Sequence, residues 1–217
     1  MKTFLSIGSG PGIGFATAER FAREGYRVVL SARDLARAKA LALNLQAQGH
    51  AAQARAVDAS DAAQVAALVA AVEAEHGAID VLHYNAASLR QASLADQAAD
   101  TFNSDLAVNI GGALAAAQAV ARPMAARQSG SILLTGGHFG ITPNPDYLSL
   151  SLGKAGIRAL ALALFEPSKA QGVHVATVTV AAHVQPDSKE ATGIAEAFWQ
   201  LHSQPKHAWT AETTYTA

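Results

Sequence analysis

The chain has 217 residues, 50% of them hydrophobic, and carries 16 basic against 17 acidic side chains for a formal net charge of -1. A chain of this length can bury a sizeable core within one domain, and its near-neutral charge argues against a dedicated nucleic-acid or membrane-surface binder. The absence of cysteine excludes disulfides, thiolate catalysis and cysteine-ligated metals, and is compatible with a reducing compartment.

Short runs rich in β-branched residues alternate with longer segments rich in alanine and leucine along the whole chain. This alternation is typical of βαβ units on a parallel sheet, and runs that are apolar on both faces suit strands covered by helices on both sides. The predicted strands are Thr3 to Ile7, Tyr26 to Ser31, Ala51 to Val57, Ile79 to Tyr84, Ser131 to Thr135, Val173 to Val180 and, as a seventh, Ala208 to Thr214. The predicted helices are Ile13 to Glu24, Leu35 to Gln48, Ala62 to His76, Ala98 to Arg127, Leu148 to Gln171 and Ile194 to His202. We therefore predict one α/β domain over residues 1 to 217, with a doubly wound parallel sheet of about seven strands flanked by helices.

The first predicted strand follows Lys2, and a lysine before an apolar run also begins many signal peptides. The apolar run ends within a few residues at a glycine-rich turn, far short of a secretory core or a membrane-spanning helix. The sequence therefore predicts a cytoplasmic protein with no membrane partner.

The first strand-to-helix turn reads IGSGPGIG over residues 7 to 14. Glycines permit such a tight turn and let the N-H groups at the helix start approach a pyrophosphate. Glycines at this corner can alternatively serve packing alone. The residues expected to bind a dinucleotide here are Gly8, Ser9, Gly12, Ile13 and Gly14.

Residues at the ends of the second and third predicted strands are expected to contact the adenosine part of the cofactor. Small residues followed by Arg33 leave room for the 2'-phosphate of NADP, whereas an acidic residue there would favour NAD, so NADP(H) is expected over NAD(H). Arg33 could also be an ordinary solvated arginine. Asp58 is placed to accept a hydrogen bond from the adenine amino group or, alternatively, to cap the next helix.

The fourth predicted strand ends at Asn85-Ala86-Ala87. Small side chains at Ala86 and Ala87 would let a cofactor lie flat over the strand end. The amide of Asn85 can hydrogen-bond neighbouring strand ends together. All three residues are therefore expected at the cofactor site.

These motifs, in this order and spacing, resemble the short-chain dehydrogenase/reductase family across almost the whole chain. The family pattern G-x-x-x-G-x-G is met by Gly8, Gly12 and Gly14, and its Asn-Asn-Ala-Gly motif corresponds to YNAA at residues 84 to 87. The helix asparagine of the family corresponds to Asn109. The resemblance implies a Rossmann-type fold, a nicotinamide cofactor, a small-molecule substrate and a homo-oligomer, a dimer or tetramer, joined through the long alanine-rich helices.

The catalytic half departs from the family pattern. Lys154 matches the lysine of the Tyr-x-x-x-Lys motif, but the tyrosine position four residues earlier is Leu150. The family serine lies thirteen residues before that tyrosine, and this position is Gly137. Two of the four family catalytic positions therefore lack reactive side chains, while Asn109 and Lys154 remain.

Carbonyl reduction needs a proton donor as well as a hydride, and Tyr147 is the first candidate to replace the missing tyrosine. If Asp146 caps a helix that begins at Tyr147, the tyrosine lies about 10 Å along the axis from Lys154, too far for direct pairing. If the helix begins nearer Ser149, Tyr147 lies on a turn and could fold over the substrate. Its ring could instead simply pack on the surface.

Other groups could also handle the proton. His138 and His183 have the imidazole chemistry for it, although a lone histidine in such a segment is more often structural. Lys154 can hydrogen-bond the nicotinamide ribose with or without catalysis. Asn109 could hold a water beside that lysine, or it could mark a helix kink.

The predicted function is that of an atypical NADP(H)-dependent oxidoreductase acting on a small carbonyl or alcohol, with catalytic residues Asn109, Lys154 and Tyr147. The alternative is an inactive NADP(H)-binding sensor or partner protein. The scattered histidines show no metal-ligand spacing, so no metal is expected.

Overall fold

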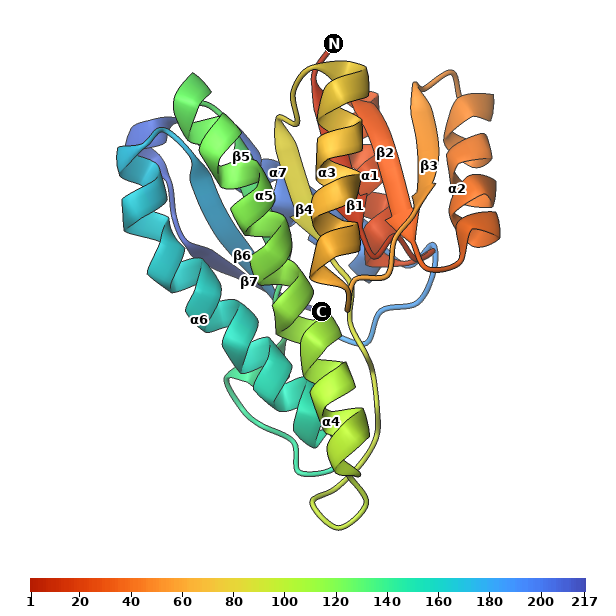
Figure 1. Ribbon diagram of the computed structural model, residues 1–217, viewed down its shortest axis with the longest axis vertical. Coiled ribbons are helices and arrows are strands. Elements are labelled where there is room, and N and C mark those ends of the chain that lie inside the picture. The colour runs from red at the N-terminus through yellow and green to blue at the C-terminus, as the bar shows by residue number, and fades with distance from the viewer.

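The computed structural model describes all residues 1–217 and contains one seven-stranded parallel sheet of order β3-β2-β1-β4-β5-β6-β7 (Figure 1). The strands are β1 (Thr3–Ile7), β2 (Arg27–Ala32), β3 (Ala52–Ala56), β4 (Val81–Tyr84), β5 (Ser131–Thr135), β6 (His174–Ala181) and β7 (Glu212–Thr216). The helices are α1 (Ile13–Arg23), α2 (Leu35–Ala47), α3 (Ala62–His76), α4 (Ala99–Leu106), α5 (Gly112–Arg127), α6 (Leu148–Ala170) and α7 (Lys189–Ser203). The predicted doubly wound α/β fold is confirmed.

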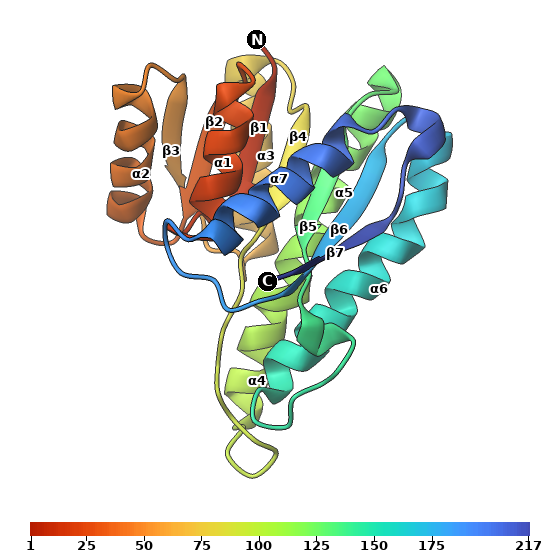
Figure 2. The same cartoon turned by 180° about the vertical axis from the view of Figure 1, so that it is seen from behind.

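Helices cover both faces of the sheet, which explains why the strand runs are apolar on both sides. Helices α3, α5 and α6 share one core with the sheet, and α1, α2 and α7 share the other (Figures 1 and 2). The chain leaves β1 for β2 in one direction and enters β4 on its other side, so the strand order reverses between β1 and β4. Ligands of open α/β sheets bind at the carboxyl ends of the strands beside such a reversal.

The segment predicted as one helix from Ala98 to Arg127 is interrupted. A π-helical turn, Ala107–Gly111, separates α4 from α5. The hydroxyl of Tyr84 donates a 2.5 Å hydrogen bond to the carbonyl of Val108. Gly112 permits this close approach, because an added Cβ would lie 2.4 Å from the Tyr84 hydroxyl. The interruption thus coincides with a contact between distant segments, which helical periodicity does not report.

Two elements near the carboxyl end begin away from their predicted positions. Helix α7 starts at Lys189 rather than Ile194, because Ser188 caps it by accepting a 3.1 Å hydrogen bond from the N-H of Ala191. A 3-10 turn, Lys206–Ala208, takes the start of the predicted seventh strand, so β7 begins only at Glu212.

Helix α6 is long and apolar enough to cross a membrane by length and composition alone, with 33% of its most apolar window buried. In this fold it packs along the sheet beside β6 (Figure 1). A core helix of a parallel sheet passes the same composition test because its inner face is buried against strands. Its position brings Lys154 to the carboxyl edge of the sheet.

A substitution at Gly8 tests the packing of the glycine-rich turn. Gly8 has a φ of +89°, and an added Cβ would lie 2.2 Å from the backbone nitrogen of Ala86. Gly8→Ala should lower the free energy of unfolding by at least about 1–3 kcal/mol, as backbone strain does, measured by urea denaturation. Gly10→Ala is the control, because an added Cβ there meets nothing within 4 Å. Equal denaturation midpoints for the two variants would contradict this packing.

Candidate active site

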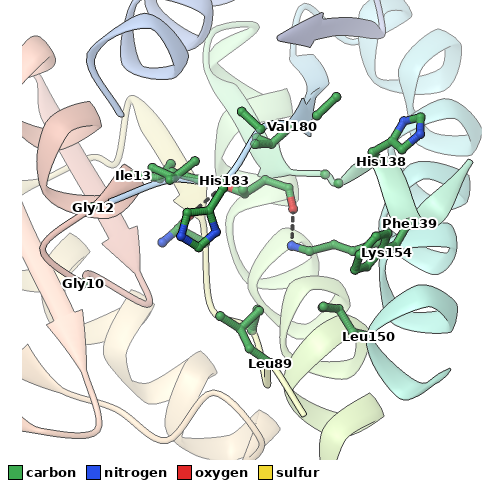
Figure 3. Close-up of a pocket in the computed structure, with 18 of the residues that line it drawn as sticks. Gly10, Gly12, Ile13, Leu89, His138, Phe139, Leu150, Lys154, Val180 and His183 are labelled. Carbon is green, nitrogen blue, oxygen red and sulfur yellow. Dashed lines mark hydrogen bonds between the residues drawn. The ribbon is translucent and has the colours of Figure 1, made fainter. Parts of the chain in front are cut away.

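A pocket of about 870 Å³ opens at the carboxyl edge of the sheet, beside the strand reversal (Figure 3). The glycine-rich turn forms one end of it. The ends of β4, β5 and β6 form its floor, and the turn before α6 with the first residues of α6 forms the far wall. This is the place where a doubly wound sheet binds a nucleotide.

The helix start of the glycine-rich turn fits a pyrophosphate. Gly12, Ile13 and Gly14 line the pocket, and the first N-H groups of a helix have no intrahelical partner. An added Cβ on Gly12 would meet only the side chain of Val184, at 3.8 Å, so the backbone stands open to the pocket.

Gly8 and Ser9 were also expected to contact the cofactor, but they stand behind the pocket wall. The N-H groups of both residues donate to the carbonyl of Ser31, each at 2.9 Å. Ser9 is 1% exposed, and its hydroxyl donates to the carbonyl of Ser6 at 3.2 Å. These two residues shape the turn rather than face a ligand.

Arg33 and Asp58 follow β2 and β3, outside the residues that line the pocket. Asp58 accepts hydrogen bonds from the hydroxyl and the N-H of Ser60, at 2.7 Å and 2.9 Å. These bonds, with the charge of Arg33, lower the pKa of Asp58. The cap of α3 is Asp61, so the alternative that Asp58 caps this helix is wrong.

Asn85 ties the central strand ends together. Its Nδ2 donates to the carbonyl of Gly8 at 2.8 Å, and its Oδ1 accepts from the hydroxyl of Thr135 at 2.9 Å. Ala87 lines the pocket, whereas Ala86 packs against Gly8. The fourth-strand motif thus contributes an amide link and only one of its two alanines to the pocket surface.

His83 lies beneath this link and was not recognised in the sequence. It is fully buried on β4, and its two ring nitrogens lie 3.1 Å from the hydroxyl of Thr135 and 3.4 Å from that of Ser6. Since Thr135 donates to Asn85, the ring must donate to Thr135 and accept from Ser6. Burial, with the charge of Lys154, lowers the pKa of His83 to about 3, so the ring is neutral. The sequence signal that could have indicated His83 is a polar residue in the middle of an apolar strand.

Lys154 points into the pocket from α6, and its Nζ donates a 2.7 Å hydrogen bond to the carbonyl of Thr135 (Figure 3). Burial lowers the pKa of this amine to about 8. A Cβ added at Gly137 would lie 3.2 Å from Cγ of Lys154, and Leu150 lines the pocket one helical turn earlier. The two positions where the family has hydroxyls therefore both border this lysine, and neither supplies a proton.

Asn109 lies in the π-helical turn and does not line the pocket. Its Oδ1 accepts from the N-H of Ser88 at 2.6 Å, and its Nδ2 donates to the carbonyl of the same residue at 3.3 Å. Both amide atoms therefore hold the loop after β4. This geometry assigns the side chain an anchoring role rather than that of a water ligand beside Lys154.

Tyr147 forms part of the far wall. Helix α6 begins at Leu148, between the two starts considered from the sequence, and Tyr147 occupies the cap position with no side-chain capping bond from Asp146. The backbone of Tyr147 forms a parallel bridge with Ala92. Its half-buried ring packs on Phe139, with centroids 5.5 Å apart, and lines the pocket.

The two histidines differ in orientation. The ring of His138 is exposed and turned away from the amine of Lys154 (Figure 3). The ring of His183 lies over the mouth of the pocket near Gly12, where its Nε2 is 2.6 Å from Nε2 of Gln185. Both residues line the pocket, but only the ring of His183 lies over its mouth.

Asp105 is a second group that sequence reasoning missed. It is 2% exposed and accepts from the hydroxyls of Ser149, at 2.8 Å, and Ser88, at 2.5 Å, and from Nε of Arg90, at 2.8 Å. Burial raises its pKa, but these hydrogen bonds outweigh burial and hold the pKa below the ordinary value. Asp105 thus joins the loop after β4 to the start of α6, on either side of the substrate half of the pocket.

Comparison with known proteins identifies the family. The short chain dehydrogenase family model matches residues 2–192. "Probable oxidoreductase EphD" of Mycobacterium tuberculosis is 38% identical over 129 residues, 59% of this chain but 22% of EphD. D-threitol dehydrogenase of Mycolicibacterium smegmatis is 30% identical over 178 residues, 82% of this chain and 68% of that protein. The solved structure of a metagenomic short-chain oxidoreductase in complex with NADP superimposes with a TM-score of 0.92 at 27% identity, covering 99% of this chain and 96% of that one.

The chain therefore belongs to the short-chain dehydrogenase family. It spans well under two thirds of the length of EphD. Among the described residues, no group of three or more histidine and carboxylate side chains is arranged to hold a metal ion.

The pKa of Lys154 can be tested by pulse labelling of lysines across a range of pH. The fraction of Lys154 that reacts with an amine-specific reagent should rise through about pH 8, because burial favours the neutral amine. Quantitative mass spectrometry of the labelled peptides measures this, with exposed Lys39 as the internal reference for reagent reactivity. A midpoint near the ordinary lysine value of about 10.4 would show that the amine is solvated.

Proposed function

We propose that the protein is an NADP(H)-dependent oxidoreductase that moves a hydride to or from a small carbonyl or alcohol substrate, with its proton donor displaced from the family position. The observation that carries this proposal is that one pocket joins the open helix start at Gly12 to the amine of Lys154 and an apolar far wall. A cofactor that spans the helix start and the amine of Lys154 would leave room for a substrate at the apolar far wall.

The residues present fit a dinucleotide. The N-H groups of Gly12, Ile13 and Gly14 would hold the pyrophosphate, and two N-H groups of Lys154 remain for the nicotinamide ribose. Arg33 would receive the 2'-phosphate of NADP. The bound nicotinamide would supply or accept the hydride. The metagenomic relative that binds NADP with nearly the same fold supports this choice of cofactor.

Tyr147 is the proposed proton donor. It is the hydroxyl-bearing side chain of the far wall, and no protein group within the described chain bonds its hydroxyl. The carboxamide of Asn109 is held by Ser88, so a water positioned by that side chain is the weaker proposal. Lys154 and Asn109 would then act by orienting the cofactor and the substrate loop.

The alternative is an NADP(H)-binding sensor or partner protein without turnover. Gly137 and Leu150 favour it, because both family hydroxyls are absent. The two functions share cofactor binding and differ in NADPH oxidation. NADPH oxidation with any carbonyl acceptor would exclude the sensor, and NADPH left intact by a broad panel would support it.

Homo-oligomerisation through α5 and α6 is part of the proposal, as is a cytoplasmic location. The exposed side chains of Leu114, Leu152 and Leu162, 43%, 48% and 41% accessible, support an interface on these helices. Burial of such apolar side chains would stabilise a dimer or tetramer.

Arg33 provides a test of cofactor preference. Arg33→Ala should weaken NADPH binding roughly 10- to 100-fold, because a charge-assisted hydrogen bond contributes about 1.5–3 kcal/mol, and should leave NADH binding unchanged. Titration by calorimetry measures both constants. Arg122→Ala, which removes an exposed arginine from α5, is the matched control. Equal affinity of the unmodified protein for NADH and NADPH would refute the preference.

Tyr147→Phe tests the proton donor, because it keeps the packing on Phe139 and removes only the hydroxyl. The kcat for an aliphatic aldehyde or ketone should fall by about 10²-fold or more, the usual contribution of a general acid. The Kd for NADPH should stay the same. Tyr215→Phe, on β7 and away from the pocket, is the control. An unchanged kcat in Tyr147→Phe would remove this residue from the mechanism.

A further inference from the structure

The substrate half of the pocket is walled by apolar side chains from three separate segments. Leu89 comes from the loop after β4, Phe139 from the turn after β5 and Leu150 from α6. The rings of Phe139 and Tyr147 lie side by side at an interplanar angle of 33°, and both line the pocket. Aromatic walls bind flat apolar ligands best, because the ring faces contribute contact area and stacking.

Polar groups are few around this space, and the far wall carries the single hydroxyl of Tyr147. His138 is turned away from the centre and His183 lies at the exposed mouth (Figure 3). Lys154 gives one of its three N-H groups to the carbonyl of Thr135. A ligand with many hydroxyl groups would leave most of them unpaired against the wall, which lowers its affinity. This pocket therefore disfavours a polyol such as the one for which the threitol-oxidising relative is named.

The missing hydroxyls also restrict the chemistry of the acceptor. Hydride addition to an aliphatic ketone produces an alkoxide, whose conjugate acid has a pKa near that of water, about 16. Hydride addition to a quinone produces a phenolate, whose conjugate acid has a pKa of about 10. The phenolate is about six orders of magnitude less basic than the alkoxide, so it is stable enough to persist until water protonates it. With Gly137 and Leu150 in the family positions, the pocket suits the acceptor that least needs an acid.

We propose that the substrate half of this pocket binds a flat, apolar quinone as the hydride acceptor, an inference that rests on the proposed function. The hydride adds to one quinone oxygen, the carbonyl π bond breaks, and the electron pair passes through the ring to the second oxygen. That oxygen takes one proton from water, so that NADPH, quinone and a proton give NADP⁺ and hydroquinone. The positive charge of the Lys154 ammonium stabilises the phenolate before it is protonated.

Binding to the protein loaded with NADP⁺, where no hydride can be transferred, tests the ligand class. Calorimetry should show saturable binding of 1,4-naphthoquinone and of the flat ketone 1-tetralone, and none of the polyhydroxylated ketone erythrulose. Phe139→Leu should weaken naphthoquinone binding at least tenfold, whereas Phe165→Leu, which removes a ring from α6 outside the pocket, should not. Absence of saturable naphthoquinone binding, or equal binding of erythrulose, overturns the ligand class.

NADPH oxidation, corrected for the uncatalysed reaction with each acceptor, tests the chemistry. Naphthoquinone should be reduced at least 100-fold faster than 1-tetralone. Reduction of 1-tetralone within tenfold of naphthoquinone overturns the quinone inference and leaves the proposed function standing. If no acceptor oxidises NADPH while naphthoquinone still binds, the proposed function fails and the pocket remains a site for flat ligands.

Discussion

The arrangement of the site depends on one chain of hydrogen bonds across the carboxyl ends of the central strands. It runs from the carbonyl of Gly8 through Asn85 to the hydroxyl of Thr135, and the carbonyl of Thr135 holds the amine of Lys154. Neutral His83 closes it from below. Buried polar groups are costly unless each has a partner, so these hydrogen bonds fix the glycine-rich turn, two strand ends and α6 relative to one another.

This chain of hydrogen bonds includes neither of the positions where the family serine and tyrosine are missing. The serine and tyrosine of the family would stand above Lys154, at Gly137 and Leu150, and neither position takes part in the hydrogen bonds below. Replacing them removes acid chemistry without leaving a buried donor or acceptor unpaired, which would cost about 1–3 kcal/mol each. The nucleotide half of a short-chain dehydrogenase can therefore persist while the reaction half changes.

The difference between local signals and contacts between distant segments explains what could be predicted from the sequence. The ends of β1, β5 and α3 match their predictions because apolar runs and turn residues are local signals. The break before α5 was anticipated only as the alternative of a kink at Asn109, because the contact of Tyr84 with Val108 joins segments that are distant in the sequence. The capped start of α7 was missed because Ser188 stands in a polar loop. Ser9 was assigned to the cofactor from its place in a motif, but its hydroxyl bonds the neighbouring strands. Which way a side chain faces is decided by tertiary packing, and a motif does not encode it.

The protein provides no free counter-ion for the amine of Lys154. Lys154 is the cation at its centre, and the nearby buried carboxylates are already paired, Asp105 with Arg90 and Glu212 with Arg158. Burial without a counter-ion is what lowers the pKa of this lysine to about 8. A ligand or product that brings negative charge beside Nζ would reverse part of this shift, because an opposite charge favours the ammonium form. The proton on Lys154 is therefore held less firmly in the empty pocket and more firmly as an anion forms beside it, which is the electrostatic behaviour required where hydride transfer creates an oxyanion.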